Sequence, residues 1–478
     1  MKKVILTIAI TAISSIVYAG GINTNTNQHA AYQRNFAREA AIDIDGAYSN
    51  PAGLVFMEDG LYAAFSYQCA FQERNIETSY APFSMNGGNS TKKYEGKATA
   101  PFVPSLQAVY KKGNWAFSLN LSVPGGGGKA TYDGGLPSFE SKAASLPMKL
   151  TAAGDTTSKY SINSYMKGQQ YIFGTTVGVT HKFNEYFAAY LGGRVCYAYN
   201  KYEGYVKDVT IYPKSTGYNG IKAETYFNGA AAKLRKQAAD LEKGNNLVAA
   251  KALEAKAMEL DAYANSSKDK HVDCTQDGFG FAPIIGLDFK KGNVNIATRY
   301  EFKTNLSVKN KTVIDETGMY PDGETSNNDM PALWTVGMDC NLLPNVKICL
   351  GYRYYFDKDA EMANDKQDYV NHGTKEYAYG IEWDITKSIL VSCGYLRTQF
   401  DFADKYLSDM NFNQSSNNYG LGARFGITER LKLDVAGFIT SYETRKKDVA
   451  DYAGLGIGGS DYYSRENYAF ALGVNYKF

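Results

Sequence analysis

Apolar and polar residues alternate along much of the chain with a period of two. Between residues 61 and 71 the odd positions are apolar, and the even positions are mostly small or polar. The same alternation recurs at residues 115–123 and 346–354. Because successive side chains of a strand point to opposite faces, each segment predicts a strand with one apolar and one polar face.

Segments of this kind recur until the last residue of the chain. We expect about fourteen strands, at residues 60–76, 101–111, 114–124, 170–182, 185–203, 277–290, 293–308, 331–341, 345–357, 375–385, 388–401, 417–427, 430–446 and 466–478. Their connections alternate between tight turns and loops of more than ten residues. An even number of antiparallel strands, with short turns at one end and long loops at the other, is typical of an outer-membrane β-barrel.

The N-terminus predicts export from the cytoplasm. Lys2 and Lys3 precede an apolar run over residues 4–17, and small residues lead to Ala19. This is the pattern of a signal peptide at residues 1–19, cleaved after Ala19, and the run is too short to span a bilayer. No apolar segment of spanning length follows, and the mean hydropathy is -0.37, which excludes a helical membrane protein.

The composition fits a barrel rather than a soluble secreted protein. Aromatic residues make up 14% of the chain, with 39 tyrosines, and barrels carry aromatic girdles at both membrane interfaces. The formal net charge is only +2, so we expect no nucleic acid partner. The six cysteines are widely spread without CxxC spacing, so we expect no metal site. Cys340 and Cys349 should point to opposite strand faces, so we predict no disulfide framework.

The last eleven residues form an alternating strand that ends on the aromatic Phe478. This resembles the C-terminal signal that the barrel-assembly machinery reads, so that machinery is an expected partner. Outer-membrane lipid is the other, because one face of every strand is apolar. We therefore expect localisation in the bacterial outer membrane.

Residues 20–58 lack sustained alternation, although they contain apolar residues and the turn signal Asn50-Pro51. A solvated tail would need neither. We predict that this segment plugs the barrel lumen.

At this point the chain resembles the FadL family of outer-membrane transporters for long-chain fatty acids and other hydrophobic compounds. The family has an N-terminal hatch with an Asn-Pro-Ala motif shortly before the first of fourteen strands, and Asn50, Pro51 and Ala52 match that motif. The resemblance covers the mature chain, with a hatch at residues 20–58 and a barrel at 59–478. It implies passive uptake of a hydrophobic solute, such as a long-chain fatty acid or an aromatic hydrocarbon, without a cofactor.

The resemblance also implies a kink in the third strand that opens the barrel wall sideways. That strand is expected to end in Val123 followed by Pro124, Gly125, Gly126, Gly127 and Gly128. Proline cannot donate a ladder hydrogen bond and glycine tolerates unusual dihedral angles, so this run should interrupt strand pairing. The alternative is that these residues only begin a flexible loop.

The longest loop, at about residues 205–275, is expected to be helical. Apolar spacing over residues 230–264, interrupted at 244–246, predicts two amphipathic helices. The resemblance implies that this loop helps to form an external landing groove, and the alternative is a helical pair that caps the barrel or packs on a neighbour. In the fifth strand, Arg194 and Lys201 are candidate cations for a fatty-acid carboxylate.

We expect no enzymatic activity, because none of the four histidines falls in a plausible catalytic setting. The main alternative function is an outer-membrane adhesin or structural barrel, since long loops serve adhesion equally well. We expect a monomer.

Overall fold

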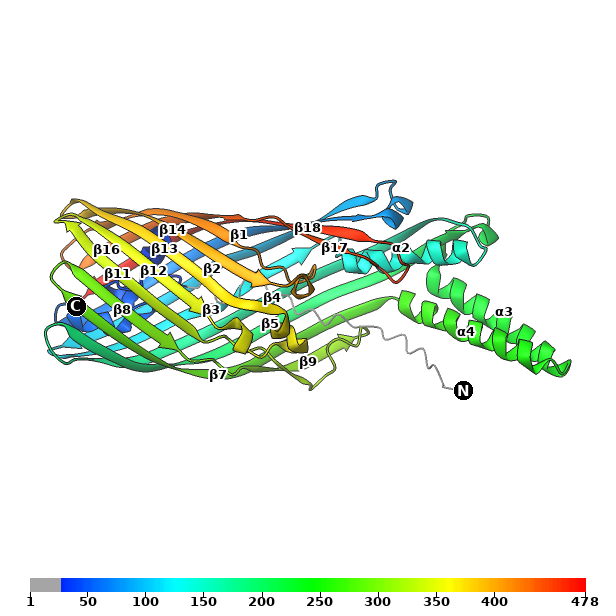
Figure 1. The fold of residues 1–478 in the computed structure, drawn as a ribbon, viewed down its shortest axis with the longest axis horizontal. Coiled ribbons are helices and arrows are strands. Elements are labelled where there is room, and N and C mark those ends of the chain that lie inside the picture. Colours follow the sequence, from blue (N-terminus) through cyan, green and yellow to red (C-terminus); the bar gives the residue numbers. More distant parts are fainter. Residues whose placement is uncertain (1–26) are drawn as a thin grey trace.

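The protein is a closed antiparallel β-barrel of fourteen wall strands with a segment of chain inside it (Figure 1). The computed structural model describes residues 27–478. The predicted signal peptide and residues 20–26 lie outside the described part.

The wall strands follow one another around the barrel in chain order. They are β1 (Gly60–Tyr80), β2 (Thr91–Lys112), β3 (Trp115–Tyr132), β4 (Thr157–Lys182), β5 (Phe187–Pro213), β7 (Lys270–Lys291), β8 (Val294–Glu301), β11 (Leu333–Leu343), β12 (Val346–Tyr355), β13 (Val370–Thr386), β14 (Ile389–Phe402), β15 (Ser416–Gly426), β16 (Leu431–Tyr442) and β18 (Gly459–Lys477). The last strand pairs with the first, with Phe65 opposite Val474, and this closes the barrel. Closure leaves no unpaired sheet edge.

Four shorter strands accompany the wall strands at the long-loop end. These are β6 (Ile221–Lys222), β9 (Ser307–Asp315), β10 (Thr325–Asn327) and β17 (Arg445–Val449). Residues 302–306 lie outside any named strand after β8, and β9 then pairs with β7. Strand β17 pairs with β18 beyond the end of β16. Strands β9 and β17 therefore extend the wall toward the long loops.

The connections alternate between short turns and long loops, as the sequence predicts. Gly113 and Gly292 sit in two of the tight turns with φ angles of 58° and 55°, a conformation that glycine adopts without steric cost. All the tight turns lie at one end of the barrel, and the long loops lie at the other (Figure 1). In outer-membrane barrels the short turns face the periplasm and the long loops face the cell exterior.

Several strands run further toward the long loops than the sequence predicts. Strand β4 begins at Thr157 rather than at 170, and β5 reaches Pro213, so the loop expected at 205–275 is limited to residues 214–269. The third strand does not end at the Pro124–Gly128 run, because β3 continues to Tyr132. The extra lengths carry polar residues on both faces, since both faces there lie outside lipid, and so they lack the alternation used to find them.

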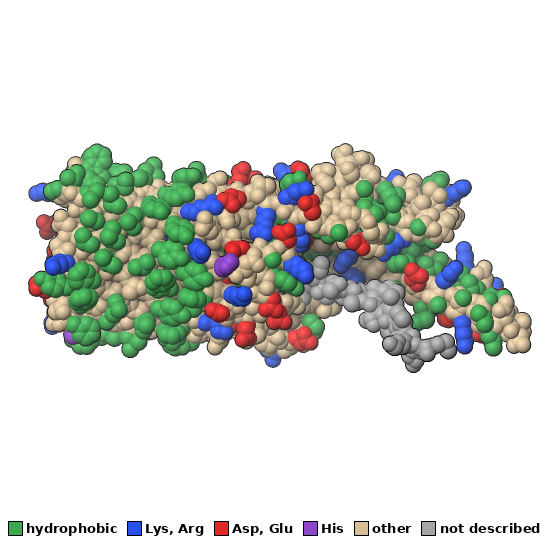
Figure 2. All heavy atoms as spheres, in the orientation of Figure 1, with side chains coloured by type: hydrophobic (Ala, Val, Ile, Leu, Met, Phe, Trp, Pro, Cys, Tyr) green, Lys and Arg blue, Asp and Glu red, His purple; other side chains and the backbone are tan. Residues whose placement is uncertain are grey.

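The outer face of the barrel carries an apolar band next to the short-turn end (Figure 2). Its side chains are exposed in the isolated molecule, and examples are Phe117 on β3, Leu191 on β5, Trp383 on β13, Leu421 on β15 and Leu472 on β18. Charged side chains gather on the long-loop side of this band (Figure 2). A band of this kind is the surface that an outer-membrane barrel presents to lipid.

Helices occur inside the barrel and beyond the long loops. Inside lie α1 (Ala30–Arg34) and two short 3₁₀ turns, η1 (Ile44–Ala47) and η2 (Pro51–Phe56). Beyond the long loops lie α2 (Pro137–Ala152), which the sequence reading missed, and the hairpin of α3 (Ala223–Lys243) and α4 (Leu247–Ser267) (Figure 1). Within residues 27–478, no helix combines the length and apolarity needed to cross a bilayer.

Candidate functional site

Residues 27–58 lie in the lumen near the short-turn end and are called the hatch below (Figure 1). Two arginines of the hatch are almost fully buried. Arg34 Nη1 lies 3.0 Å from Glu382 Oε1 of β13, and Arg34 Nε lies 3.3 Å from Asp434 Oδ1 of β16. Arg38 Nη1 lies 2.9 Å from the same oxygen of Glu382, and Arg38 Nη2 lies 2.7 Å from Asp45 Oδ1. The hatch is thus held to the wall by buried ion pairs.

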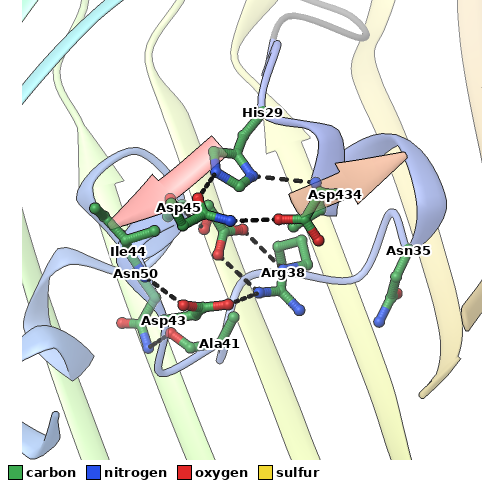
Figure 3. A network of polar contacts seen from close by, with 12 residues as sticks. His29, Asn35, Arg38, Ala41, Asp43, Ile44, Asp45, Asn50 and Asp434 are labelled. Atoms are coloured by element: carbon green, nitrogen blue, oxygen red, sulfur yellow. Dashed lines mark hydrogen bonds and ion pairs between the residues drawn. The ribbon is translucent and has the colours of Figure 1, made fainter. Parts of the chain in front are cut away.

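Carboxylates surround the guanidinium of Arg38 and favour its charged form. Burial alone would lower the pKa of Arg38, but Asp45 and Glu382 hold it well above its usual value. Burial would raise the pKa of Asp43, yet Arg424 and Arg38 hold it well below its usual value. Figure 3 shows Arg38 beside the carboxylates of Asp43 and Asp45. Removing one member of such a set leaves a buried charge without compensation, which costs about 3 to 5 kcal/mol.

A second buried set holds the middle of the hatch. Arg353 of β12 contacts Glu39 Oε1 with its Nε at 2.5 Å, and its Nη1 lies 3.0 Å from Glu376 Oε2. The same guanidinium donates to the carbonyl oxygen of Phe36 at 2.6 Å and to the hydroxyl of Tyr32 at 3.0 Å. Backbone and side chains of the hatch are therefore both bound by one arginine of the wall.

The wall is free of side chains where the hatch backbone runs along it. Six glycines on the inner faces of β11 to β15 lie against the hatch, and a Cβ atom added to any of them would collide with an atom of the hatch. They are Gly337, Gly351, Gly380, Gly394, Gly420 and Gly422. A Cβ on Gly394 would lie 2.7 Å from the Phe36 nitrogen, and one on Gly337 would lie 2.9 Å from the Ala40 nitrogen. These residues, called the glycine row below, let the hatch lie directly on the wall.

The Asn50-Pro51-Ala52 motif holds the last turn of the hatch. The Asn50 side chain accepts a bond from the Gly53 nitrogen at 3.3 Å and donates to Asp288 Oδ2 of β7 at 2.6 Å. The Pro51 carbonyl oxygen accepts a bond from the hydroxyl of Thr180 on β4 at 2.7 Å. Ala52 is fully buried. Asn50 and Pro51 thus form hydrogen bonds with the wall, and Ala52 packs against its inner face.

The wall itself is interrupted between β2 and β3. Their pairing runs up to Leu106 opposite Leu121 and resumes only at Thr99 opposite Lys129. Among the residues whose contacts the structure describes, none of 100–105 pairs with 122–126 or with Gly128, and the two segments 100–105 and 122–128 are called the wall gap below. Strand β3 also bulges against β4 here, and Gly126 has a φ of 112°. The Pro124–Gly128 run thus lies inside a strand, at a break in the ladder.

Prolines on both strands explain the break. Pro101 and Pro104 lie in the β2 segment of the wall gap and Pro124 in the β3 segment, and none of them has an N–H to donate. The sequence reading used Pro124 but passed over the Pro-Phe-Val-Pro run on β2, which signals the same break from the other side. Phe102 and Leu121 beside the wall gap are exposed on the outer face, so the gap lies at the level of the apolar band.

The two cations proposed for a ligand carboxylate already have acidic neighbours. Arg194 lies inside the barrel, is 2% exposed, and binds Glu301 at 2.5 Å while its guanidinium covers the Tyr48 ring of the hatch. Lys201 lies on the outer face and binds Glu203. The structure does not bring these two cations together, because they sit on opposite faces of β5.

An apolar cavity of about 150 Å³ lies at the long-loop end, between α2, β4, β5 and β7. Apolar side chains from these elements line it, among them Phe139, Leu146, Met166, Val209 and Val272. Lys142, Lys268 and Lys270 also reach it. The cavity could not be predicted from the sequence, because its lining comes from segments far apart in the chain.

The base of α4 borders the cavity through Ser266 and Ser267, but the α3–α4 hairpin itself extends away from the barrel (Figure 1). Its exposed apolar residues include Val248 and Met258. Arg235 on α3 joins the two helices through Glu254 and Asp261 of α4.

The chain ends at the seam of the barrel. The Phe478 nitrogen donates to the Leu61 carbonyl oxygen at 2.9 Å, and its ring lies 4.8 Å from that of Tyr476. The Phe478 side chain is exposed on the outside.

No protein-family model matches the chain, and no curated protein sequence matches it either. Solved structures do match over nearly the whole length. A FadL homologue of Pseudomonas aeruginosa is 14% identical with a TM-score of 0.63, covering 96% of this chain and all of that one. The toluene transporter TbuX of Ralstonia pickettii is 11% identical with a TM-score of 0.56, covering 97% of this chain and 99% of its own.

The toluene transporter TodX of P. putida gives a similar result, with 12% identity, a TM-score of 0.54 and coverage of 97% and 99%. Identities this low establish a common architecture and leave the solute open. The chain therefore has the fold of the FadL homologue and the toluene transporters, a closed antiparallel β-barrel of fourteen strands.

Proposed function

We propose that this protein carries hydrophobic compounds passively across the outer membrane, without enzymatic activity. The observation that carries the proposal is the wall gap between β2 and β3 at the level of the apolar band. A closed channel to the periplasm has no use for such a gap, whereas an apolar solute gains free energy by leaving sideways into lipid. The ion pairs of the hatch oppose the alternative route straight through the lumen.

The apolar cavity supplies the entrance site in this proposal. Apolar cavities of about 150 Å³ in other proteins stay dry and bind benzene, and this cavity has that size. Burial contributes about 0.8 kcal/mol per CH₂ group of a solute. Three lysines and one carboxylate, that of Asp409, line the cavity. The excess of positive charge favours a solute with an anionic group, and long-chain fatty acids combine both features. Aromatic hydrocarbons are the second candidate class.

The cavity and the wall gap share one strand. Met166 of β4 lines the cavity, and Ile172 of the same strand pairs with Gly125 in the wall gap. Six residues of strand separate them, a distance of about 20 Å. A solute would therefore move down the inner face of β4 from the cavity to the gap, above the hatch.

Uptake of labelled oleate and labelled toluene tests the route in cells that lack other barrels of this kind. One variant closes the wall gap by replacing Pro101, Pro104 and the run 124–128 with alternating Thr and Val. It should abolish uptake while purified protein still binds oleate. Unchanged uptake would overturn the lateral exit.

A second variant, Val209→Asp, places a negative charge in the cavity, which repels a carboxylate and disfavours an alkyl chain, and should abolish both oleate binding and uptake. Val248→Asp on the exposed part of α4 is the matched control and should leave both unchanged. A barrel that serves only adhesion would neither bind oleate nor carry it, even without any substitution.

A further inference from the structure

A polar pocket of about 220 Å³ opens on the wall where β13, β14 and the residue ahead of β15 meet. It lies on the long-loop side of the apolar band, where charged side chains gather (Figure 2). A β-bulge shapes the pocket, because Gly373 and Thr374 of β13 together oppose only Phe400 of β14. Strand β15 begins at Ser416, so β14 runs on beyond Thr398 without β15 beside it.

The outward side chains of β13, β14 and β15 show where the apolar band ends. Opposed residues of the three strands form rows across the wall, and toward the long loops these rows change from apolar to tyrosine to polar. The rows are Ile381, Cys393 and Leu421, then Tyr379, Tyr395 and Tyr419, then Tyr377, Arg397 and Asn417, and then Lys375 and Gln399. Tyrosines of membrane barrels gather at the edge of the hydrocarbon layer. The pocket, which includes Lys375 and Arg397, therefore lies at the level of the lipid headgroups.

Lys375 and Arg397 are the cations that line the pocket. Arg397 binds Glu443, and its Nη1 lies 3.4 Å from the Asn417 side-chain oxygen. Within residues 27–478 the Lys375 side chain forms no ion pair or hydrogen bond, so its charge is available to a bound anion.

The carboxylate that lines the pocket, Asp401, is already bound. Its two oxygens lie 2.9 Å from Asn371 Nδ2 and 2.6 Å from His372 Nδ1. The hydroxyl oxygen of Ser415 accepts a bond from a backbone nitrogen at 3.0 Å, which leaves its proton to donate. The ammonium group of Lys375 and this hydroxyl can therefore both donate to an anion in the pocket.

We propose that this pocket binds the phosphate group of an outer-leaflet lipid, with Lys375 and Arg397 as its cationic contacts. The acyl chains of the same molecule lie on the apolar and tyrosine rows next to the pocket. A free phosphate ion gains the polar contacts but not the apolar ones, and this favours the lipid. The inference rests on the outer-membrane position that the proposed function also requires, but not on transport. Solute uptake and lipid binding can therefore fail independently of each other.

Native mass spectrometry of the detergent-purified full chain tests the site with three probes. These are diphosphoryl lipid A, the same lipid without its phosphates, and inorganic phosphate. The diphosphoryl lipid should bind at least about tenfold more tightly than the dephosphorylated lipid, and millimolar inorganic phosphate should not displace it. Equal binding of the two lipids would overturn the site. Displacement by inorganic phosphate would overturn the lipid as its ligand.

Substitutions place the binding in the pocket. Each cation near a membrane surface contributes about fivefold in affinity, so Lys375→Gln should weaken binding of diphosphoryl lipid A about fivefold and the double variant with Arg397→Gln about 20-fold. Lys97→Gln is the matched control, because Lys97 is an exposed lysine of the outer face on β2, across the barrel from β13, and it should leave the affinity unchanged. Unchanged affinity in the double variant would refute the proposal. Equal losses in Lys97→Gln and Lys375→Gln would refute it as well, because binding would then follow total charge.

Discussion

Replacing Arg38 by methionine tests how firmly the hatch is held. The substitution keeps the length of the side chain but removes the only ion-pair partner of Asp45 within residues 27–478. Glu382 keeps Arg34 at 3.0 Å and Lys347 at 3.1 Å, so it remains compensated. Asp45 is fully buried, and one uncompensated buried charge costs about 3 to 5 kcal/mol.

Hydrogen exchange of the peptide 36–50 in detergent-solubilised barrel measures this cost. If exchange requires local release of the hatch, Arg38→Met should lower its protection by about two to four powers of ten. The double variant Arg38→Met with Asp45→Asn removes the stranded charge and should recover at least half of that loss in free energy.

Arg235→Met is the matched control for an exposed ion-pair arginine. Arg235 also has two acidic partners, Glu254 and Asp261, but its side chain is 42% exposed. Exposed pairs contribute about 1 kcal/mol or less, so the exchange of the α3–α4 hairpin should change by less than about tenfold. A loss of protection below tenfold in Arg38→Met, or no recovery in the double variant, would refute the reasoning.

Three further substitutions probe the long-loop end and the glycine row. Burial and the charge of Lys447 lower the pKa of Lys366 from 10.5 to about 8, so the folded loop loses stability as the pH falls from 10.5 to about 8, and the whole penalty is present below that range. Lys366→Met should stabilise residues 363–369 against proteolysis by up to about 3 kcal/mol at pH 7; an equal gain at pH 11 would contradict this. Burial would raise the pKa of Glu140, but bonds from Lys92 and Tyr94 hold it below its usual value, so docking of α2 should weaken only as the pH falls below about 4.5. Hydrogen exchange of α2, corrected for intrinsic pH dependence, should show this loss at pH 3 and, in Glu140→Gln, already at pH 6. Gly394→Ala should destabilise the hatch by about 1 to 3 kcal/mol, measured by exchange of the peptide 36–50, and unchanged exchange would show that the wall can yield.

The wall of the barrel could be predicted because lipid imposes a simple pattern. On β3, Trp115, Phe117, Leu119 and Leu121 all point outward, and the polar residues between them point inward. Above the apolar band this constraint disappears. Strand β4 extends to Thr157 with polar residues on both faces, and for that reason the predicted strands are too short there.

The sequence predicts a plug at residues 20–58, but the contacts of that segment could not be predicted. Nothing local indicates that Arg34 meets Glu382, because 348 residues separate them. The sequence suggests Arg194 and Lys201 as ligand cations only through their charge and their place in the fifth strand. Their actual partners, Glu301 and Glu203, follow from strand register and from the face on which each side chain lies.

The glycine row has a consequence for the order in which the molecule assembles. The hatch is near the start of the chain, whereas the row lies on β11 to β15, which are synthesised several hundred residues later. Contacts between such distant segments form late in folding, because a long loop must close before they give any stabilisation. The part of the hatch that lies on the glycine row therefore cannot be seated until the second half of the wall exists, and seating it is among the last events of folding.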